Sequence, residues 1–160
     1  MKRPVPIIIY RPRLCDLDNM AHDWEKGRSS DVIDRLRGII SSPFARFMGI
    51  ELVNISSDGE VTVRMDIQGK ENSLGAAHGG TVFALADQAF AIAGNLGPEY
   101  QVAISASINY VRPGLGPLEA KAKLICETKS TSLYEAKVFQ GGEMIALFQG
   151  TGYKLRKRSE

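Results

Sequence analysis

The sequence predicts an α+β fold in which a curved antiparallel sheet wraps around one long central helix. Two observations lead to this fold class. One apolar helical run lies within residues 71–95, and its apolar side chains occupy nearly every face of the helix. Two strand-like runs precede it and four follow it, with short connections that favour antiparallel pairing. Because a helix that is apolar all round needs more cover than a flat sheet provides, we expect the sheet to curve around it.

The segment ahead of the first helix, residues 1–28, contains three prolines and no sustained periodicity. We treat it as an N-terminal appendage, disordered or docked, in front of a domain at residues 29–160. Ser29–Asp31 supplies N-cap chemistry for an amphipathic helix that runs to Ile40.

The stretch that follows this helix, residues 44–49, is expected to form a turn or a short helical piece that leads into the strands. It contains Phe44 and Phe47, two large aromatic side chains that we expect to anchor in the core.

The strands are recognised by alternation of apolar and polar residues and by turn residues between them. The first two flank Ser57, Asp58 and Gly59, and an Asp-Gly pair is a strong hairpin signal. Strands are expected at residues 50–56, 60–68, 102–111, 118–128, 132–140 and 143–155.

Composition excludes several classes of protein. The 160 residues, 44% hydrophobic and 24% charged, fit a single globular domain, and a net charge of +2 does not favour nucleic-acid binding. We expect the basic tail at residues 154–158 to be solvated. No stretch approaches the roughly 20 apolar residues that span a bilayer, so we expect no membrane segment and no export signal.

The two cysteines, Cys15 and Cys126, are far apart and lack a neighbouring Cys or His at metal-binding spacing. The sequence therefore predicts no disulfide, no metal and no redox cofactor. Reduced thiols are typical of intracellular proteins, and we expect a cytoplasmic location.

The central helix carries one acid, Asp87. No Lys or Arg lies between Lys70 and Arg112, so burial of Asp87 without a basic neighbour in sequence should raise its pKa. Buried acids with perturbed pKa values are candidates for function. The alternative is an acid that caps a loop or pairs with an arginine from another strand.

Two glycines, Gly79 and Gly80, stand where this helix begins. Free N–H groups at a helix N-terminus stabilise negative charge, and the missing side chains allow a carbonyl oxygen to approach, which is the chemistry of an oxyanion hole. Asp87 lies eight residues further on, roughly 12 Å along the helix, too far to serve the same substrate carbonyl. The spacing therefore favours a site completed by a second subunit.

The residues around this helix resemble a known family, the hotdog-fold acyl-CoA thioesterases, in the phenylacetate-pathway (PaaI-like) branch of the 4-hydroxybenzoyl-CoA thioesterase superfamily. The resemblance extends from about residue 44 to 155 and includes residues 43–45, 48–50 and 110–114. The central motif consists of Asn72, His78, Gly79, Gly80, Leu85, Ala86 and Asp87.

The resemblance implies a homodimer, or a dimer-of-dimers tetramer, with two active sites at each dimer interface. It implies that Asp87 of one subunit acts on an acyl-CoA thioester as general base or nucleophile, while the N–H of Gly79 from the partner polarises the carbonyl. Coenzyme A is then part of the substrate, and no further cofactor is expected. The helper hydroxyls that some relatives carry fall here on Ala91 or near Ala103 and Ser105.

Four further residues keep two interpretations each. His78 and Asn72 match family positions that orient the nucleophile or line the thioester pocket, but His78 could only shape the loop and Asn72 could only form an Asx-turn. Phe83, grouped with Gly80 as a substrate contact, is either a core residue or part of an acyl pocket. Arg112 is either a ligand for the coenzyme A phosphates or a surface residue before a turn.

Two other functions compete with hydrolysis. A non-catalytic acyl-CoA-binding module on the same fold would be expected to lack a competent acid or to carry a DNA-binding domain. A hotdog dehydratase or hydratase would place its Asp and His in a different local motif, which this sequence does not show.

Overall fold

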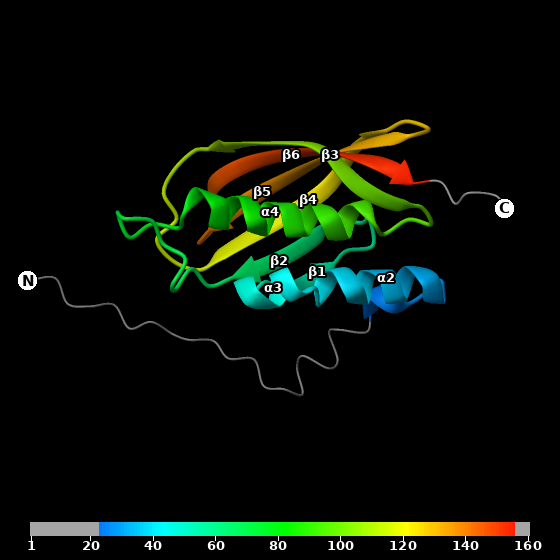
Figure 1. Cartoon of the computed structure of the whole chain (residues 1–160), viewed down its shortest axis with the longest axis horizontal. Coiled ribbons are helices and arrows are strands. Elements are labelled where there is room, and N and C mark those ends of the chain that lie inside the picture. Colours follow the sequence, from blue (N-terminus) through cyan, green and yellow to red (C-terminus); the bar gives the residue numbers. More distant parts are fainter. Residues whose placement is uncertain (1–22, 156–160) are drawn as a thin grey trace, which may run out of the picture.

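The computed structural model describes residues 23–155, and it shows six antiparallel strands curved around one central helix (Figure 1). This confirms the predicted fold class and the predicted order of elements. The strand order is β1-β2-β4-β5-β6-β3, so β1 and β3 form the two edges. The elements are η1 (Asp23–Glu25), α2 (Ser30–Ile40), α3 (Pro43–Met48), β1 (Glu51–Ile55), β2 (Val61–Met65), α4 (Gly79–Gly94), β3 (Tyr100–Tyr110), β4 (Leu118–Glu127), β5 (Thr131–Gln140) and β6 (Glu143–Leu155).

The central helix α4 packs against the concave face of the sheet. Most of its side chains are buried, as the sequence predicts, and Phe90 contacts the rings of Tyr134 and Phe148 at centroid distances of 5.4 and 5.8 Å. One face of the helix is less covered than the others. It carries three half-buried residues spaced four apart, Phe83, Asp87 and Ala91. The helix is therefore not covered on every face within one chain, and its open stripe carries the acid.

The strand β3 closes one edge of the sheet and pairs only with β6 among the described residues, from Tyr100 opposite Leu155 to Tyr110 opposite Ala146. A bulge interrupts the register between Ala103 and Ser105. The strand is eleven residues long and exposed along most of its length. A long edge strand of this kind is a template for pairing with another chain.

The helix α2 lies beside the C-terminal half of α4 and fixes its end. Nε2 of the buried Gln88 donates to the carbonyl of Ile39 at 2.9 Å. The Arg35 guanidinium donates to the carbonyls of residues 95, 97 and 98 and stacks on the ring of Tyr100 at 5.2 Å. One arginine thus joins α2, the end of α4 and the start of β3.

The segment at residues 23–28 is docked, which is one of the two alternatives for the N-terminal appendage. Trp24 belongs to the hydrophobic core, and its carbonyl accepts a hydrogen bond from Nη1 of Arg28 at 2.9 Å. The rest of the appendage, including Cys15, lies outside the described residues.

Two expectations about single residues are wrong. Phe44 and Phe47 are 55% and 81% exposed, because α3 turns Ala45 toward the core instead. Lys154 is not part of a solvated tail: it lies in β6 and its Nζ contacts carboxylate oxygens of Glu127 at 2.6 Å and Glu99 at 3.6 Å. The remainder of the basic tail lies outside the described residues.

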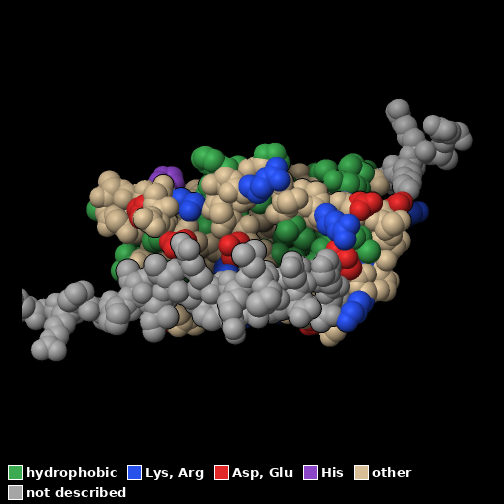
Figure 2. All heavy atoms as spheres, turned by 90° about the horizontal axis from the view of Figure 1, so that it is seen from below, with side chains coloured by type: hydrophobic (Ala, Val, Ile, Leu, Met, Phe, Trp, Pro, Cys, Tyr) green, Lys and Arg blue, Asp and Glu red, His purple; other side chains and the backbone are tan. Residues whose placement is uncertain are grey.

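Charged side chains of both signs are interspersed on the face shown in Figure 2, without a large patch of one sign in the part that is coloured. None of the helices within residues 23–155 combines the length and apolar character needed to cross a bilayer.

Candidate active site

The loop before α4 is held by Asn72. Its Oδ1 accepts hydrogen bonds from the N–H groups of Leu74 at 2.9 Å and Ala76 at 3.2 Å, and its own N–H donates to the carbonyl of Ala76. The structure therefore shows the Asx-turn, one of the two interpretations of Asn72. This turn sets the path of the chain into the helix.

His78 is the N-cap of α4. Its Nδ1 accepts a hydrogen bond from the N–H of Gly80 at 3.0 Å, and its carbonyl accepts from the N–H groups of Thr81 and Val82 at 2.8 and 3.1 Å. A ring nitrogen that accepts a hydrogen bond carries no proton, so the ring proton of neutral His78 is on Nε2. His78 thus shapes the start of the helix.

These bonds distinguish the two glycines. The N–H groups of Gly80, Thr81 and Val82 all have acceptors, whereas that of Gly79 has none among residues 23–155. A helix N-terminus with a free N–H favours an anionic or partly negative ligand. Of the two glycines, Gly79 is therefore the one whose N–H is available to a ligand, and the N–H of Gly80 is occupied by the cap.

The carboxylate of Asp87 lies two helical turns away on the half-buried stripe of α4. Desolvation by burial raises its pKa above the ordinary value of 3.8, as the sequence predicts. No hydrogen bond or ion pair of this carboxylate is formed within residues 23–155. It is thus neither a loop cap nor the partner of an arginine in the described chain.

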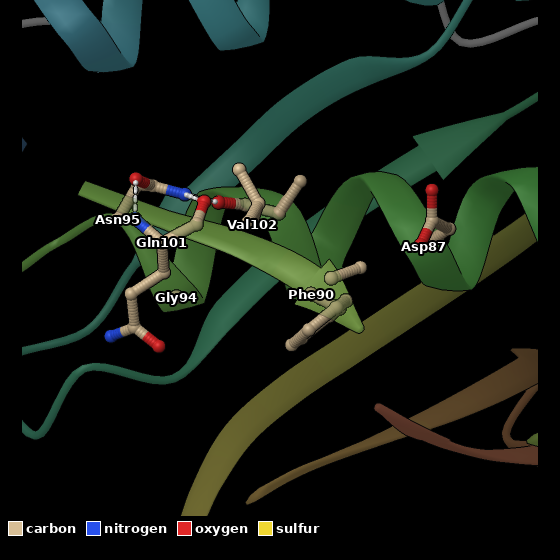
Figure 3. Close-up of a pocket in the computed structure, with 8 residues that line it drawn as sticks. Asp87, Phe90, Gly94, Asn95, Gln101 and Val102 are labelled. Atoms are coloured by element: carbon tan, nitrogen blue, oxygen red, sulfur yellow. Dashed lines mark hydrogen bonds between the residues drawn. The ribbon is translucent and has the colours of Figure 1, made fainter. Parts of the chain in front are cut away.

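A small pocket of about 90 Å³ opens beside Asp87 between α4 and the start of β3. Figure 3 shows Asp87 at one end of the group of lining residues and Asn95 with Gln101 at the other, where the N–H of Gln101 donates to Oδ1 of Asn95 at 3.0 Å. Its walls are mainly apolar. The lining residues are Asp87, Phe90, Ala91, Gly94, Asn95, Gln101, Val102 and Ala103.

The helper positions Ala91 and Ala103 both line this pocket, so the structure brings them to the acid. Neither carries a hydroxyl, and Ser105 lies beyond the bulge in β3. Among the described residues that line the pocket, Asp87 is the one with an ionisable side chain.

Besides Gly80, the two other predicted substrate contacts occupy different surroundings. Phe83 lies on the same stripe as Asp87, and its ring meets that of Phe148 edge-on at 5.3 Å, so it is packed and half-exposed at once. Arg112 is exposed and pairs with Glu143, with Nη1 and Oε2 3.2 Å apart. Within one chain Arg112 is thus engaged by a surface acid.

Two residues of the site were missed by sequence reasoning. The hydroxyl of Tyr110 donates to the carbonyl of Gly79 at 2.9 Å, and Gln101 lines the pocket with Asp87. Both lie on β3, and no local spacing relates them to α4. The only signal was the position of Tyr110 at the start of the recognised segment 110–114.

The predicted residues thus form two separate groups. The N-terminal group contains Asn72, His78, Gly79 and Gly80, and the second group surrounds Asp87. Along a helix that rises 1.5 Å per residue, the eight residues from Gly79 to Asp87 span roughly 12 Å. In the described chain no three His, Cys, Asp or Glu side chains converge in a metal-binding arrangement.

Comparison with known proteins places this chain in a family. A family model described as "Acyl-CoA thioesterase N-terminal domain" matches residues 67–153. The acyl-coenzyme A thioesterase PaaI of Escherichia coli K12 is 31% identical over 115 residues, which is 69% of this chain and 81% of that protein.

Solved structures agree. The PaaI protein of the Escherichia coli phenylacetic acid degradation operon superposes with a TM-score of 0.71 at 28% identity, covering 79% of this chain and 96% of that one. A mutant of the phenylacetic acid degradation protein PaaI from Thermus thermophilus gives a TM-score of 0.65 at 36% identity, covering 71% and 100%. The chain belongs to the PaaI-like branch of the hotdog-fold acyl-CoA thioesterases, enzymes that hydrolyse acyl-CoA thioesters.

Proposed function

We propose that two copies of this chain share each active site, with Asp87 of one copy and the N–H of Gly79 of the other acting on the same thioester. One observation supports this proposal most directly. The free N–H of Gly79 and the unpartnered carboxylate of Asp87 lie two turns apart on the same helix. Neither is complete alone, because acyl transfer needs both activation of the nucleophile and stabilisation of the oxyanion.

The edge strand β3 supports a specific arrangement of the two copies. The hydroxyl of Tyr110 touches Gly79 at one end of the strand, and Val102 lines the Asp87 pocket near the other end. Antiparallel pairing of β3 with its own copy, centred on Ala106, would set Tyr110 opposite Val102 of the partner subunit, since each lies four residues from the centre. The partner's Gly79 would then approach Asp87.

The chemistry follows from this arrangement. Water adds to the thioester carbonyl carbon, the C–S bond breaks, and the products are the free acid and coenzyme A thiol. Asp87 either removes a proton from the water or attacks the carbonyl carbon itself to give a mixed anhydride that water then cleaves. In both cases the Gly79 N–H faces the oxygen that becomes negative.

The acyl group would lie in the pocket beside Asp87, whose walls are mainly apolar and whose volume in one copy suits a small group. Two relatives are named for phenylacetic acid degradation. We therefore expect arylacetyl thioesters to be hydrolysed faster than long fatty acyl thioesters.

The direct test is a panel of acyl-CoA thioesters, phenylacetyl-CoA, hexanoyl-CoA and the long-chain palmitoyl-CoA among them, assayed for release of free thiol. Asp87→Asn should lower turnover at least about a hundredfold with the oligomeric mass unchanged. Asp58→Asn, in the exposed turn between β1 and β2, is the matched control and should keep full activity. Near-wild-type turnover of Asp87→Asn on a good substrate would disprove the role of Asp87.

The arrangement of the two copies is tested by cross-linking. In a background with Cys15→Ser and Cys126→Ser, Ala106→Cys should form a disulfide with its own copy, because residues opposite each other in antiparallel strands have Cα atoms about 4.5–5.5 Å apart, within the range that a disulfide spans. Ser57→Cys, in the turn at the opposite sheet edge, should stay uncross-linked. Equal cross-linking of both variants, or of neither, would contradict pairing through β3.

A further inference from the structure

We propose that Tyr110 is a positioning residue for the oxyanion donor: together with His78, it fixes the peptide group that follows Gly79 and ties the start of α4 to the end of β3. The proposal rests on the function proposed for Gly79 and adds a residue that acts through it.

The geometry is that of one peptide group held at both of its polar atoms. The carbonyl of Gly79 accepts a hydrogen bond from the Tyr110 hydroxyl at 2.9 Å. The N–H of the same peptide group, which belongs to Gly80, donates to Nδ1 of His78 at 3.0 Å. With this group fixed, the backbone of Gly79 has little freedom to turn its own N–H away from a substrate.

The same contacts explain why both positions are glycine. A Cβ at Gly79 would lie 3.2 Å from the hydroxyl oxygen of Tyr110, and a Cβ at Gly80 would lie 3.2 Å from Nδ1 of His78. Both distances are shorter than ordinary carbon contacts, so each holding side chain fits closely because no Cβ is present. Two successive glycines are intrinsically flexible, and external hydrogen bonds compensate for that freedom.

Tyr110 also links the donor to the strand that we propose as the subunit interface. It is the last residue of β3 and pairs with Ala146 of β6, so its backbone is fixed by the sheet. The Tyr110 side chain reaches from this edge of the sheet to the start of α4. Pairing of β3 between copies would therefore place Gly79 at a defined position over the partner's pocket.

The test compares Tyr110→Phe, which removes only the hydroxyl, with Tyr153→Phe as a matched control. Tyr153 is exposed to a similar degree, 43% against 54%, and its hydroxyl makes no hydrogen bond within residues 23–155. Tyr110→Phe should lower kcat about three- to tenfold, the usual effect of one hydrogen bond, with KM within about twofold. Tyr153→Phe should leave both unchanged.

A second measurement is independent of activity. The backbone amide resonances of Gly79 and Gly80 should shift in Tyr110→Phe and stay in place in Tyr153→Phe, with the dimer mass retained in all cases. Should no thioester be turned over, the proposed function fails, but the amide resonances still report whether Tyr110 holds this peptide group.

Variants of His78 can be compared with those of Tyr110, since His78 holds the N–H of the peptide group whose carbonyl Tyr110 holds. His78→Ala and Tyr110→Phe should be non-additive in kcat, because the second variant disturbs a group already released by the first. His78→Asn should restore much of the loss, as Asn is a good N-cap.

Three outcomes would overturn the role of Tyr110. The first is unchanged kcat and unchanged amide resonances in Tyr110→Phe. The second is a rise in KM alone, which would indicate direct contact with substrate. The third is loss of the dimer, which would indicate a purely structural role.

Discussion

The N–H of Gly80 donates to Nδ1 of His78, and this bond leaves the neighbouring Gly79 with the free donor at the start of α4. A motif of two glycines after a histidine is therefore asymmetric in its chemistry. One glycine completes the helix cap, and the other keeps an N–H without an acceptor in the described chain, which is why we propose it as the oxyanion donor. The histidine itself shapes the helix terminus as its N-cap.

The contribution of His78 as N-cap can be measured as a change in the free energy of unfolding. His78→Ala should lower the free energy of unfolding by about 1 kcal/mol, the usual effect of losing an N-cap, and His78→Asn should retain most of it. Urea denaturation at one fixed protein concentration gives both values. Equal stability of the Ala variant and the wild type would show that the His78–Gly80 bond contributes nothing.

Asp87 should lower stability while it supports activity. Because burial raises its pKa above 3.8, the folded chain disfavours the ionised form, so stability falls as pH rises through the interval between 3.8 and the raised pKa. Asp87→Asn should therefore have a higher Tm than the wild type at pH 7, and the difference should vanish toward pH 4. Thermal melts at both pH values decide this, and a lower Tm of the variant at pH 7 would contradict it.

The pH dependence of catalysis follows from the same group. Both mechanisms for Asp87 need the carboxylate, so kcat/KM should rise with pH through a pKa above 3.8 and then level off on that limb. This rise of kcat/KM with pH should be absent from the residual activity of Asp87→Asn. An acid limb that persists unchanged in this variant would assign it to another group.

Arg35 should be a main support of the end of α4. Its guanidinium donates to the carbonyls of Asn95, Gly97 and Pro98, so Arg35→Met should cost about 2 kcal/mol of unfolding free energy. Arg46→Met, at an exposed position on α3, is the matched control and should stay within about 0.5 kcal/mol of the wild type. Chemical denaturation of both variants checks this. Equal losses for the two would show that the three carbonyl contacts are not stabilising.

The sequence allowed the fold and the raised pKa of Asp87 to be predicted, for physical reasons that differ between the two. The helix and strands follow from apolar periodicity over long segments. The raised pKa of Asp87 follows from its burial on an apolar helix, with no basic neighbour in sequence to offset the desolvation. Phe44 and Phe47 were misplaced because a helix of six residues is too short for periodicity to fix which face is buried.

Contacts between distant segments explain the other differences. Lys154 meets acids from the end of β4 and from the loop before β3, and Tyr110 reaches a helix that begins thirty-one residues earlier. Neither contact leaves a local pattern in the sequence. Arg112, in the loop after β3, was predicted as a candidate, but its partner Glu143 lies at the start of β6, distant in sequence.

The central claim, that each site takes its acid and its oxyanion donor from different copies, is tested by subunit complementation. Asp87→Asn removes the acid, and Gly79→Pro removes the donor at the first helical position, where the backbone angles of proline fit a helix. The Cβ of the proline also displaces the Tyr110 side chain that contacts this glycine. Each variant alone should be nearly inactive. When the two variants are refolded together in equal amounts, half of the dimers should be hybrids. Each hybrid has one intact site out of two, so about one quarter of wild-type activity should return. A mixture that stays as inactive as its components would contradict the shared site.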